Sequence, residues 1–158
     1  MTFDIALAVG WGVVVAGLGA WLTDLSPWYY ALHKPSWQPP DWLFGPAWTL
    51  ILALASWSLF LAWRAADDRT DRLLILVQFG ANGLLNMLWS FLFFRMRRPV
   101  LALIEVPYLW FSILTPILLL LPFSQTASLL LVPYLLWVSF AAFLNLTIVR
   151  LNRPLGPQ

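Results

Sequence analysis

The chain has 158 residues, of which 61% are hydrophobic and only 10% are charged, whereas soluble domains are about 45–50% apolar and about 25% charged. So little polar surface excludes a soluble globule and predicts an integral membrane protein of one domain, residues 1–158. The formal net charge of +2, the single histidine and the absence of cysteine exclude nucleic-acid binding, disulfides, thiol catalysis and a metal centre built from His or Cys.

Five apolar segments are long enough to cross a membrane, because about 20 apolar residues span its hydrocarbon core. They cover residues 4–24, 42–64, 73–94, 99–121 and 126–149. Strands of a membrane barrel need only about 10 alternating residues, so these runs exclude a barrel. We predict an all-α fold, a five-transmembrane-helix bundle.

The first segment carries small residues at every fourth position, namely Ala8, Gly12, Ala16 and Ala20. Such a stripe lets membrane helices approach closely. It serves packing within the bundle or contact between two copies, and we favour the first. No Lys or Arg precedes the apolar run, so we expect a retained span and not a secretory signal.

The connection 25–41 is rich in aromatic residues and proline, and its core reads WYYALHKPSWQPPDW over residues 28–42. Pro35, Pro39 and Pro40 fix the backbone and remove amide donors, which favours a stiff loop over a helix. An interfacial belt of aromatic rings would not need Lys-Pro and Pro-Pro between the rings. We therefore predict a stiff, ordered loop between the first two spans.

The third span places Gln78, Asn82, Asn86, Trp89 and Phe93 on one helical face. Amides at membrane depth are expected to point inward, because exposure to lipid is costly. They either bond neighbouring helices or orient a ligand on which Trp89 stacks.

The fifth span offers a facing row at spacing four: Pro133, Trp137, Ala141 and Asn145. We expect Pro133 to bend this helix. With Trp48 of the second span, these residues indicate a pocket for a flat, mostly apolar ligand.

Glu105 is the one carboxylate that falls inside a predicted span. It either reaches water or Arg97 near the membrane boundary, or it serves a ligand or a proton, the default hypothesis for intramembrane charge.

Basic residues predict the orientation. The connections on one side hold Arg64, Arg69 and Arg72, and the other side holds Lys34, Arg95, Arg97, Arg98, Arg150 and Arg153. The second side, with the aromatic connection 25–41 and the C-terminus, is predicted to be cytoplasmic.

Four motifs occur in a fixed order: WYxxLxKPxWxPPxW (28–42), GPxW (45–48), LNxxWxxxFF (85–94) and PYLxWxxFxxxLN (133–145). Through them nearly the whole chain resembles the translocator protein family (TspO/MBR), which includes peripheral benzodiazepine receptors and bacterial tryptophan-rich sensory proteins. The resemblance is to a bacterial-type member, which implies a multi-pass protein of the bacterial cell membrane.

The resemblance implies a receptor, sensor or carrier that binds tetrapyrroles such as protoporphyrin IX or haem as ligands, with no required cofactor. Sterols, drug-like apolar ligands and a homodimer are further implied partners. The resemblance also implies that the connection 25–41 folds as a lid over a pocket at one end of the bundle. Lys34 and Pro35 match the family's lid, and His33 is incidental to its pattern. With Phe93 from the third span, the candidate ligand-binding residues are Trp28, Tyr29, Trp37, Pro40, Trp48, Asn86, Trp89, Phe93, Trp137 and Ala141.

Two alternatives follow from the same resemblance. One is an enzyme that degrades porphyrin with light and oxygen, with Trp48 and Trp137 as catalytic candidates. The other is a transporter of sterols or porphyrins, although the chain lacks the internal repeats of many transporters. Leu146 stands where animal members carry the tyrosine of a proposed sterol motif, which argues against sterol binding there.

Overall fold

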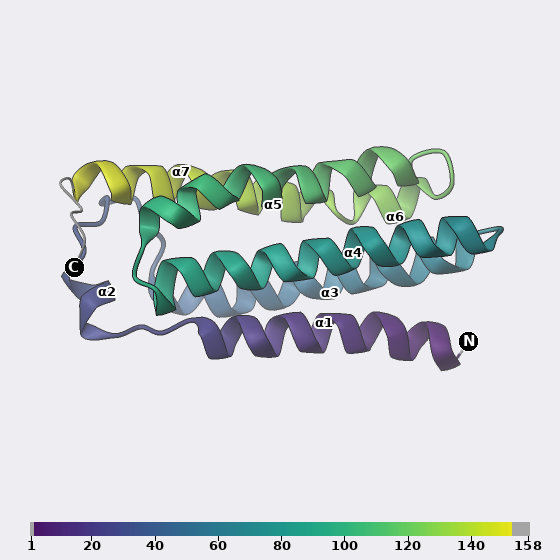
Figure 1. The fold of residues 1–158 in the computed structure, drawn as a ribbon, viewed down its shortest axis with the longest axis horizontal. Coiled ribbons are helices and arrows are strands. Elements are labelled where there is room, and N and C mark those ends of the chain that lie inside the picture. The colour runs from purple at the N-terminus through teal and green to yellow at the C-terminus, as the bar shows by residue number, and fades with distance from the viewer. Residues whose placement is uncertain (1, 153–158) are drawn as a thin grey trace.

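The computed structural model describes residues 2–152, which contain helices and no strands. The helices are α1 (Thr2–Leu22), α2 (Pro27–Ala31), α3 (Asp41–Ala65), α4 (Arg69–Ser90), the π-helical turn η1 (Phe91–Arg95), α5 (Pro99–Leu120), α6 (Gln125–Leu129) and α7 (Val132–Leu151). Figure 1 shows the long helices side by side along one axis, with the N-terminus at one end of the bundle and α2 at the other. The predicted all-α bundle is confirmed.

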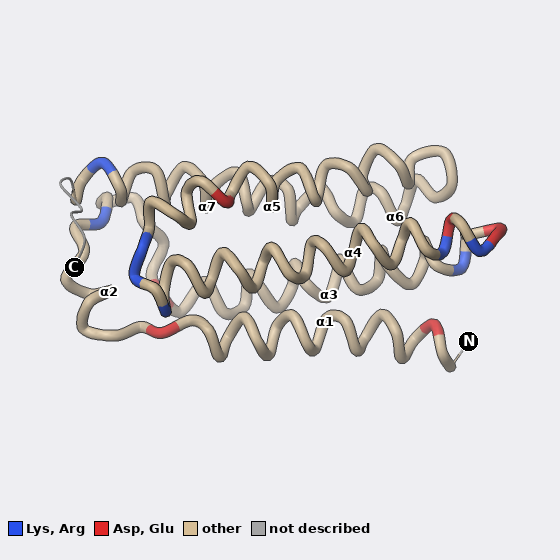
Figure 2. The backbone as a smooth tube through the Cα atoms, in the orientation of Figure 1, with Lys and Arg blue, Asp and Glu red and all other residues tan. Residues whose placement is uncertain are grey.

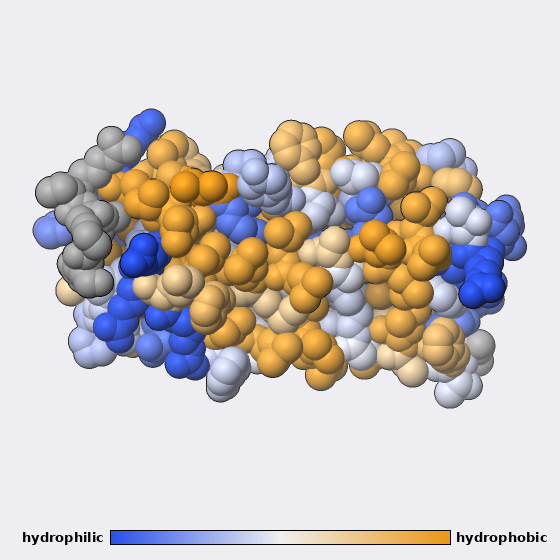
Figure 3. Space-filling view, viewed as in Figure 1, coloured by the Kyte–Doolittle hydropathy of each residue, from blue (hydrophilic) through white to orange (hydrophobic). Residues whose placement is uncertain are grey.

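Five helical segments are long and apolar enough to cross a membrane: Thr2–Leu22, Asp41–Ala65, Arg69–Arg95, Pro99–Leu120 and Gln125–Leu151. Lys, Arg, Asp and Glu gather mainly at the two ends of the bundle (Figure 2), and a broad apolar surface lies between the ends (Figure 3). The five predicted spans are therefore confirmed, with ends that differ by a few residues. The third span begins earlier than predicted because Asp68 caps α4, accepting the backbone N–H of Asp71 at 2.9 Å.

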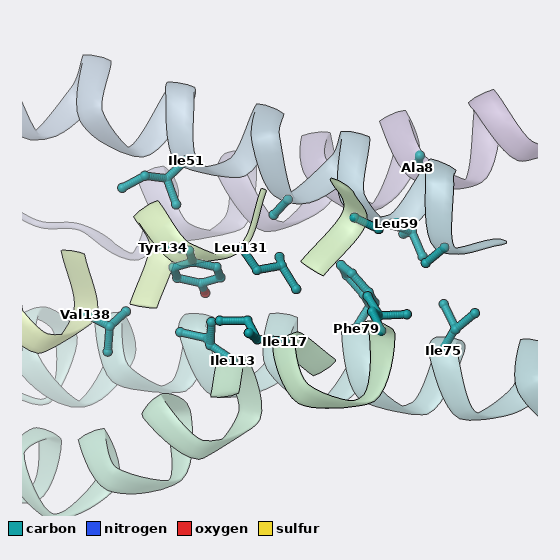
Figure 4. Packing of buried hydrophobic residues seen from close by; sticks show 14 of the residues in the cluster. Ala8, Ile51, Leu59, Ile75, Phe79, Ile113, Ile117, Leu131, Tyr134 and Val138 are labelled. Carbon is teal, nitrogen blue, oxygen red and sulfur yellow. The ribbon is translucent and has the colours of Figure 1, made fainter. Parts of the chain in front are cut away.

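The core lies where α3, α4, α5 and α7 meet, around Phe79, Ile113, Leu131 and Tyr134 (Figure 4). Helix α1 packs against α3 and α4, while α5 packs against α4 and α7. Two fully buried serines join helices across this core. Ser58 donates to the carbonyl of Ala127 at 2.6 Å, and Ser128 donates to the carbonyl of Ile117 at 2.6 Å.

Two predicted elements differ in the structure. The lid 25–41 was predicted to lack helix, but α2 occupies its first third. Ser26 precedes α2 and Pro27 opens it, and proline suits the first turn of a helix because its missing N–H has no partner there. The three prolines that disfavour helix all lie after α2.

The fifth span is divided into α6 and α7, with a turn at Leu130 and Leu131. The predicted bend therefore lies just before Pro133. Proline has no N–H to offer the carbonyl of Leu129, so the hydrogen-bond ladder of α6 cannot continue into α7.

The end of the third span forms a wider turn than an α-helix. In η1 the N–H of Met96 reaches back five residues to the carbonyl of Phe91 at 2.9 Å. Such π-type turns are frequent at functional sites. This one carries Phe93 and Phe94, which both line the cavity described next.

Candidate functional site

A cavity of about 370 Å³ lies at the lid end of the bundle, within the roughly 300–1,000 Å³ range of small-molecule pockets. Residues of the lid, α3, α4, η1 and α7 surround it. Its lining consists of Thr23, Leu25, Tyr29, Gln38, Asp41, Trp42, Phe44, Gly45, Trp48, Trp89, Ser90, Phe93, Phe94, Trp137, Ala141, Leu144, Asn145 and Ile148.

Aromatic rings form much of the cavity wall. The rings of Trp48 and Trp137 meet edge to face with centroids 6.4 Å apart, and Trp89 stacks on Phe93 at 5.2 Å. Such pairs bury large apolar areas and hold each ring in a fixed orientation. The cavity therefore presents flat, rigid surfaces to a ligand.

The lid closes over the cavity through a small polar network. The phenol of Tyr29 donates to Asp41 Oδ1 at 2.8 Å, and Gln38 Nε2 donates to the Tyr29 oxygen at 3.2 Å. Burial, reinforced by the bond to Asp41, raises the pKa of Tyr29 above its ordinary value. The Lys34 ammonium lies 3.4 Å from the centroid of the Tyr29 ring, and burial lowers the pKa of Lys34.

Two indole N–H groups in this region have no acceptor. The Nε1 atoms of Trp89 and Trp137 are buried and make no hydrogen bond within residues 2–152. A buried donor without a partner is costly. A ligand that carries acceptor atoms would satisfy them after a small adjustment of the rings.

Six of the ten candidate ligand-binding residues lie around the cavity: Tyr29, Trp48, Trp89, Phe93, Trp137 and Ala141. The other four lie elsewhere. Asn86 is buried and donates to the phenol oxygen of Tyr134 at 2.9 Å, so it joins α4 to α7 beneath the cavity. Pro40 is the residue immediately before α3 and is exposed.

The two outlying tryptophans of the lid hold it against the bundle. Trp28 meets the edge of Phe93 at 6.2 Å, and is thus separated from the cavity by one ring. Trp37 is 43% exposed and stacks on Phe143 of α7 at 5.2 Å. Both side chains therefore position the lid from outside the cavity.

Sequence reasoning missed the polar partners of the lid. Gln38 and Asp41 lie within the quoted motif, directly before and after the Pro-Pro pair. This position next to a rigid turn was the one sequence feature that could have indicated that the two side chains lie close together. Nothing in the sequence indicated Asn152. Its side-chain amide accepts from the backbone N–H of His33 at 2.9 Å and donates to the His33 carbonyl at 2.8 Å. The His33 backbone thus ties the lid to the end of α7.

The other residues singled out in the sequence fall into two groups. Ala8 and Gly12 are buried in the contact between α1 and α3, as expected for packing within the bundle, while Ala16 and Ala20 are exposed. Glu105 is 6% exposed, and neither of its carboxylate oxygens has a partner in the described part of the chain. Arg153 lies outside the described residues.

The fold and its cavity define a class: a multi-pass helical membrane protein with a ligand-sized, aromatic cavity under a lid. The chain belongs to the TspO/MBR family, whose family model matches residues 5–151. It is 40% identical over 150 residues to the tryptophan-rich protein TspO of Chlorobaculum tepidum, covering 94% of this chain and 95% of that protein.

Similarity extends to shorter stretches of other relatives. The tryptophan-rich protein TspO of Archaeoglobus fulgidus is 38% identical over 85 residues, which cover 52% of this chain and 53% of that protein. The human translocator protein is 31% identical over 80 residues, which cover 50% of this chain and 47% of that protein. The resemblance expected from the four sequence motifs is confirmed.

Proposed function

We propose that this protein is a membrane receptor or carrier that binds a tetrapyrrole, such as protoporphyrin IX or haem, in the aromatic cavity under the lid. The family supports a receptor or sensor role in the membrane. The observation that carries the proposal is the meeting of the Trp48, Trp89 and Trp137 rings around one cavity. Flat aromatic walls favour a flat, apolar macrocycle because stacking and burial supply affinity with little charge.

The polar features of the site suit the edges of such a macrocycle. The unpartnered indole N–H groups of Trp89 and Trp137 can donate to its carboxylates or other acceptors. Lys34 of the lid places a cation 3.4 Å from the ring of Tyr29, which lines the cavity. Apolar walls with a cation in the lid above them suit an amphipathic tetrapyrrole with acidic side arms, although the Asp41 carboxylate also lines the cavity.

The test is a titration of purified protein with protoporphyrin IX, followed by the absorption of the bound porphyrin. Tryptophan quenching alone is a poor signal because the chain has 11 tryptophans. We expect Trp48→Ala combined with Trp137→Ala to weaken binding strongly. The matched control is Trp57→Ala, because Trp57 is 59% exposed on α3 and lies outside this cavity. Equal affinity of the double variant and the control would contradict the proposed site.

A second candidate is light- and oxygen-dependent degradation of the porphyrin by the same site. The observation that favours it is the edge-to-face contact of Trp48 and Trp137 at 6.4 Å within the cavity wall. Indole rings so placed would lie beside an excited macrocycle. Under illumination in air, the wild-type protein should release product faster than Trp48→Phe; equal rates, or equal rates with denatured protein, would count against it.

The carrier role, binding of sterols or drug-like ligands, and the homodimer remain predictions. The exposed groove between α1 and α3, lined by Gly12, Val13, Ala53 and other apolar residues, is one surface that the lipid or a second copy would cover. Crosslinking in the native membrane would test the dimer.

A further inference from the structure

Glu105 of α5 is a buried carboxylate that the proposed ligand site does not use. Its side chain is 6% exposed and its oxygens have no hydrogen-bond partner in residues 2–152. A carboxylate at membrane depth without a partner is expensive, and such groups mark pathways for ions or protons. The predicted contact with Arg97 is not present in the structure, because no hydrogen bond reaches Glu105 there.

The contacts of α4 and α5 place Glu105 along the bundle. Asn82 of α4 donates to Ser112 of α5 at 2.9 Å, and these two helices run antiparallel (Figure 1). Seven residues back along α5 from Ser112 is Glu105, and seven residues on along α4 from Asn82 is Trp89. Glu105 therefore lies level with the base of the aromatic cavity. The Tyr134 phenol of α7 is within electrostatic range of it.

A row of polar side chains runs along the inner face of α4. Gln78, Asn82, Asn86 and Ser90 recur at every fourth position, which places them on one face of the helix. The last three of them are buried. Asn86 donates to the Tyr134 oxygen at 2.9 Å, so the phenol of α7 joins the row as Ser112 of α5 does. Hydroxyl groups can both accept and donate a hydrogen bond, as a proton relay requires.

A small cavity lies beside the first two residues of the row, Gln78 and Asn82. It has a volume of about 10 Å³, and its polar lining consists of Gln78, Asn82, Ser112 and Tyr134. A site of roughly 10–15 Å³ with several polar partners is large enough for one water molecule. Water at this position would connect the Gln78 amide to the hydroxyls of Ser112 and Tyr134.

The row opens into a larger cavity at each end. Ser90 lines the aromatic cavity under the lid. Gln78 lines a cleft of about 190 Å³ at the opposite end, whose wall also contains Asp71. At about 1.5 Å per helical residue, Asp71 and Ser90 are about 28 Å apart along α4, close to the roughly 30 Å hydrocarbon thickness.

We propose that this row is a proton path through the bundle, with Glu105 as its proton-carrying group at the lid end. A proton enters from the cleft beside Asp71, passes along water and the hydroxyls, resides on the Glu105 carboxylate and leaves to the aromatic cavity. Only O–H bonds form and break, and one positive charge crosses per proton. Bonds between helices account for Asn82 and Asn86, but they leave the unpartnered Glu105 and the cleft beside Asp71 unexplained.

The test is proton flux in liposomes that contain the purified protein and the pH-sensitive dye pyranine. A potassium gradient with valinomycin supplies the driving potential and balances the charge. We expect wild-type protein to carry protons faster than protein-free liposomes. Glu105→Gln, which cannot release a proton, should fall to the protein-free rate, and Glu105→Asp should retain flux.

Two further variants separate conduction from folding. Ser112→Ala removes the hydroxyl that accepts from Asn82 and lines the small cavity. This hydroxyl donates to the carbonyl of Leu109 at 2.7 Å, so the relay requires it to turn toward the cavity, and its removal should slow the flux. Thr115→Val is the matched control on α5, because the Thr115 hydroxyl only donates to the carbonyl of Phe111 in its own helix, at 2.8 Å; it should conduct like wild type. A variant is included only if its thermal unfolding midpoint and its elution volume in size-exclusion chromatography match those of the wild type. Wild-type flux no faster than that of empty liposomes, or full flux in Glu105→Gln, would overturn the proposal and leave the row as packing.

Discussion

At the scale of single residues, Tyr29 is the side chain on which closure of the lid depends most. It donates to Asp41, accepts from Gln38 and lies beneath the Lys34 ammonium. Its pKa lies above the ordinary value of 10.0 because burial and Asp41 both disfavour the phenolate. The closed lid therefore favours the protonated phenol.

Because the pKa of Tyr29 is raised in the closed lid, closure of the lid is expected to weaken at alkaline pH. Below pH 10 the phenol is protonated whether the lid is open or closed, so closure does not depend on its titration. Above pH 10 the open lid loses the proton more readily, and closure weakens by about 1.4 kcal/mol per pH unit. A spin label on Ser36→Cys, in a chain without natural cysteines, should become more mobile as the pH rises from 10 to 11.

The control must remove the opposing effect of Lys34. Its lowered pKa means that the closed lid favours the neutral amine, so below its ordinary pKa rising pH strengthens closure. The comparison is therefore made in Lys34→Gln, with and without Tyr29→Phe. An alkaline transition that persists in Tyr29→Phe would assign the effect to another group.

Residue types that interact with lipid or ligand could be predicted from the sequence, but their partners could not. Helical spacing predicts inward faces for Trp89 and Trp137, and depth in the second span singles out Trp48; all three line the cavity. Trp37 and Asn86 were assigned to the same pocket, although Trp37 packs on the outside of α7 and Asn86 bonds to Tyr134. Spacing defines a face of one helix, and the neighbour across that face depends on tertiary packing.

At the scale of helices, the approach of α1 to α4 depends on a missing side chain. At Gly83 a β-carbon would lie 2.9 Å from Val15 Cγ2 and 3.1 Å from Trp11 Nε1. The same contact contains a hydrogen bond from the Trp11 indole to the carbonyl of Phe79, at 2.8 Å. Close helix contacts of this kind hold membrane bundles together.

We predict that Gly83→Ala destabilises the bundle by about 1–3 kcal/mol, the usual cost of overpacking. Gly80→Ala is the matched control one turn away, because nothing lies within 4 Å of its added β-carbon. There the better helix propensity of alanine should give up to about 1 kcal/mol of stabilisation. Thermal unfolding in one detergent compares the two. Equal midpoints would show that α1 can move away from α4 at little cost.

The helical spans were predictable because hydropathy alone determines which segments cross a membrane. Their irregularities were predictable only in part. Pro133 predicts the break of the fifth span, which the structure has at Leu130 and Leu131, whereas the five-residue hydrogen bond from Met96 to Phe91 in η1 leaves no periodic trace in the sequence. Helix α2 was not predicted, because the argument against helix came from Pro35, Pro39 and Pro40. All three lie after α2 and do not restrict its residues.

At the scale of the whole molecule, charge divides the bundle into two unlike ends (Figure 2). The lid end holds Lys34, Arg95, Arg97, Arg98 and Arg150, and the other holds Arg64, Arg69 and Arg72 beside Asp67, Asp68 and Asp71. The two groups of connections therefore lie where the sequence placed them. Which end faces the cytoplasm stays a prediction.

We predict that the lid end is cytoplasmic, because Lys and Arg are retained on that side during insertion. Single cysteines at Ser36 in the lid and at Asp67 between α3 and α4 give a direct comparison. In intact cells a membrane-impermeant thiol reagent should label Asp67→Cys and spare Ser36→Cys, and both should react after permeabilisation. The reverse pattern would invert the orientation.

The clasp between His33 and Asn152 has a mechanical consequence. These residues are 119 positions apart, yet their two hydrogen bonds attach the lid to the C-terminal end of α7. A change at this end of α7, on the aqueous side, is therefore transmitted to the lid without passing through the bilayer. An affinity tag or reporter fused after α7 follows this attachment directly in the chain and can disturb it. A tag on the N-terminus lies at the far end of the bundle (Figure 1). Fusions and substitutions at the C-terminal end of α7 are thus expected to alter access to the cavity.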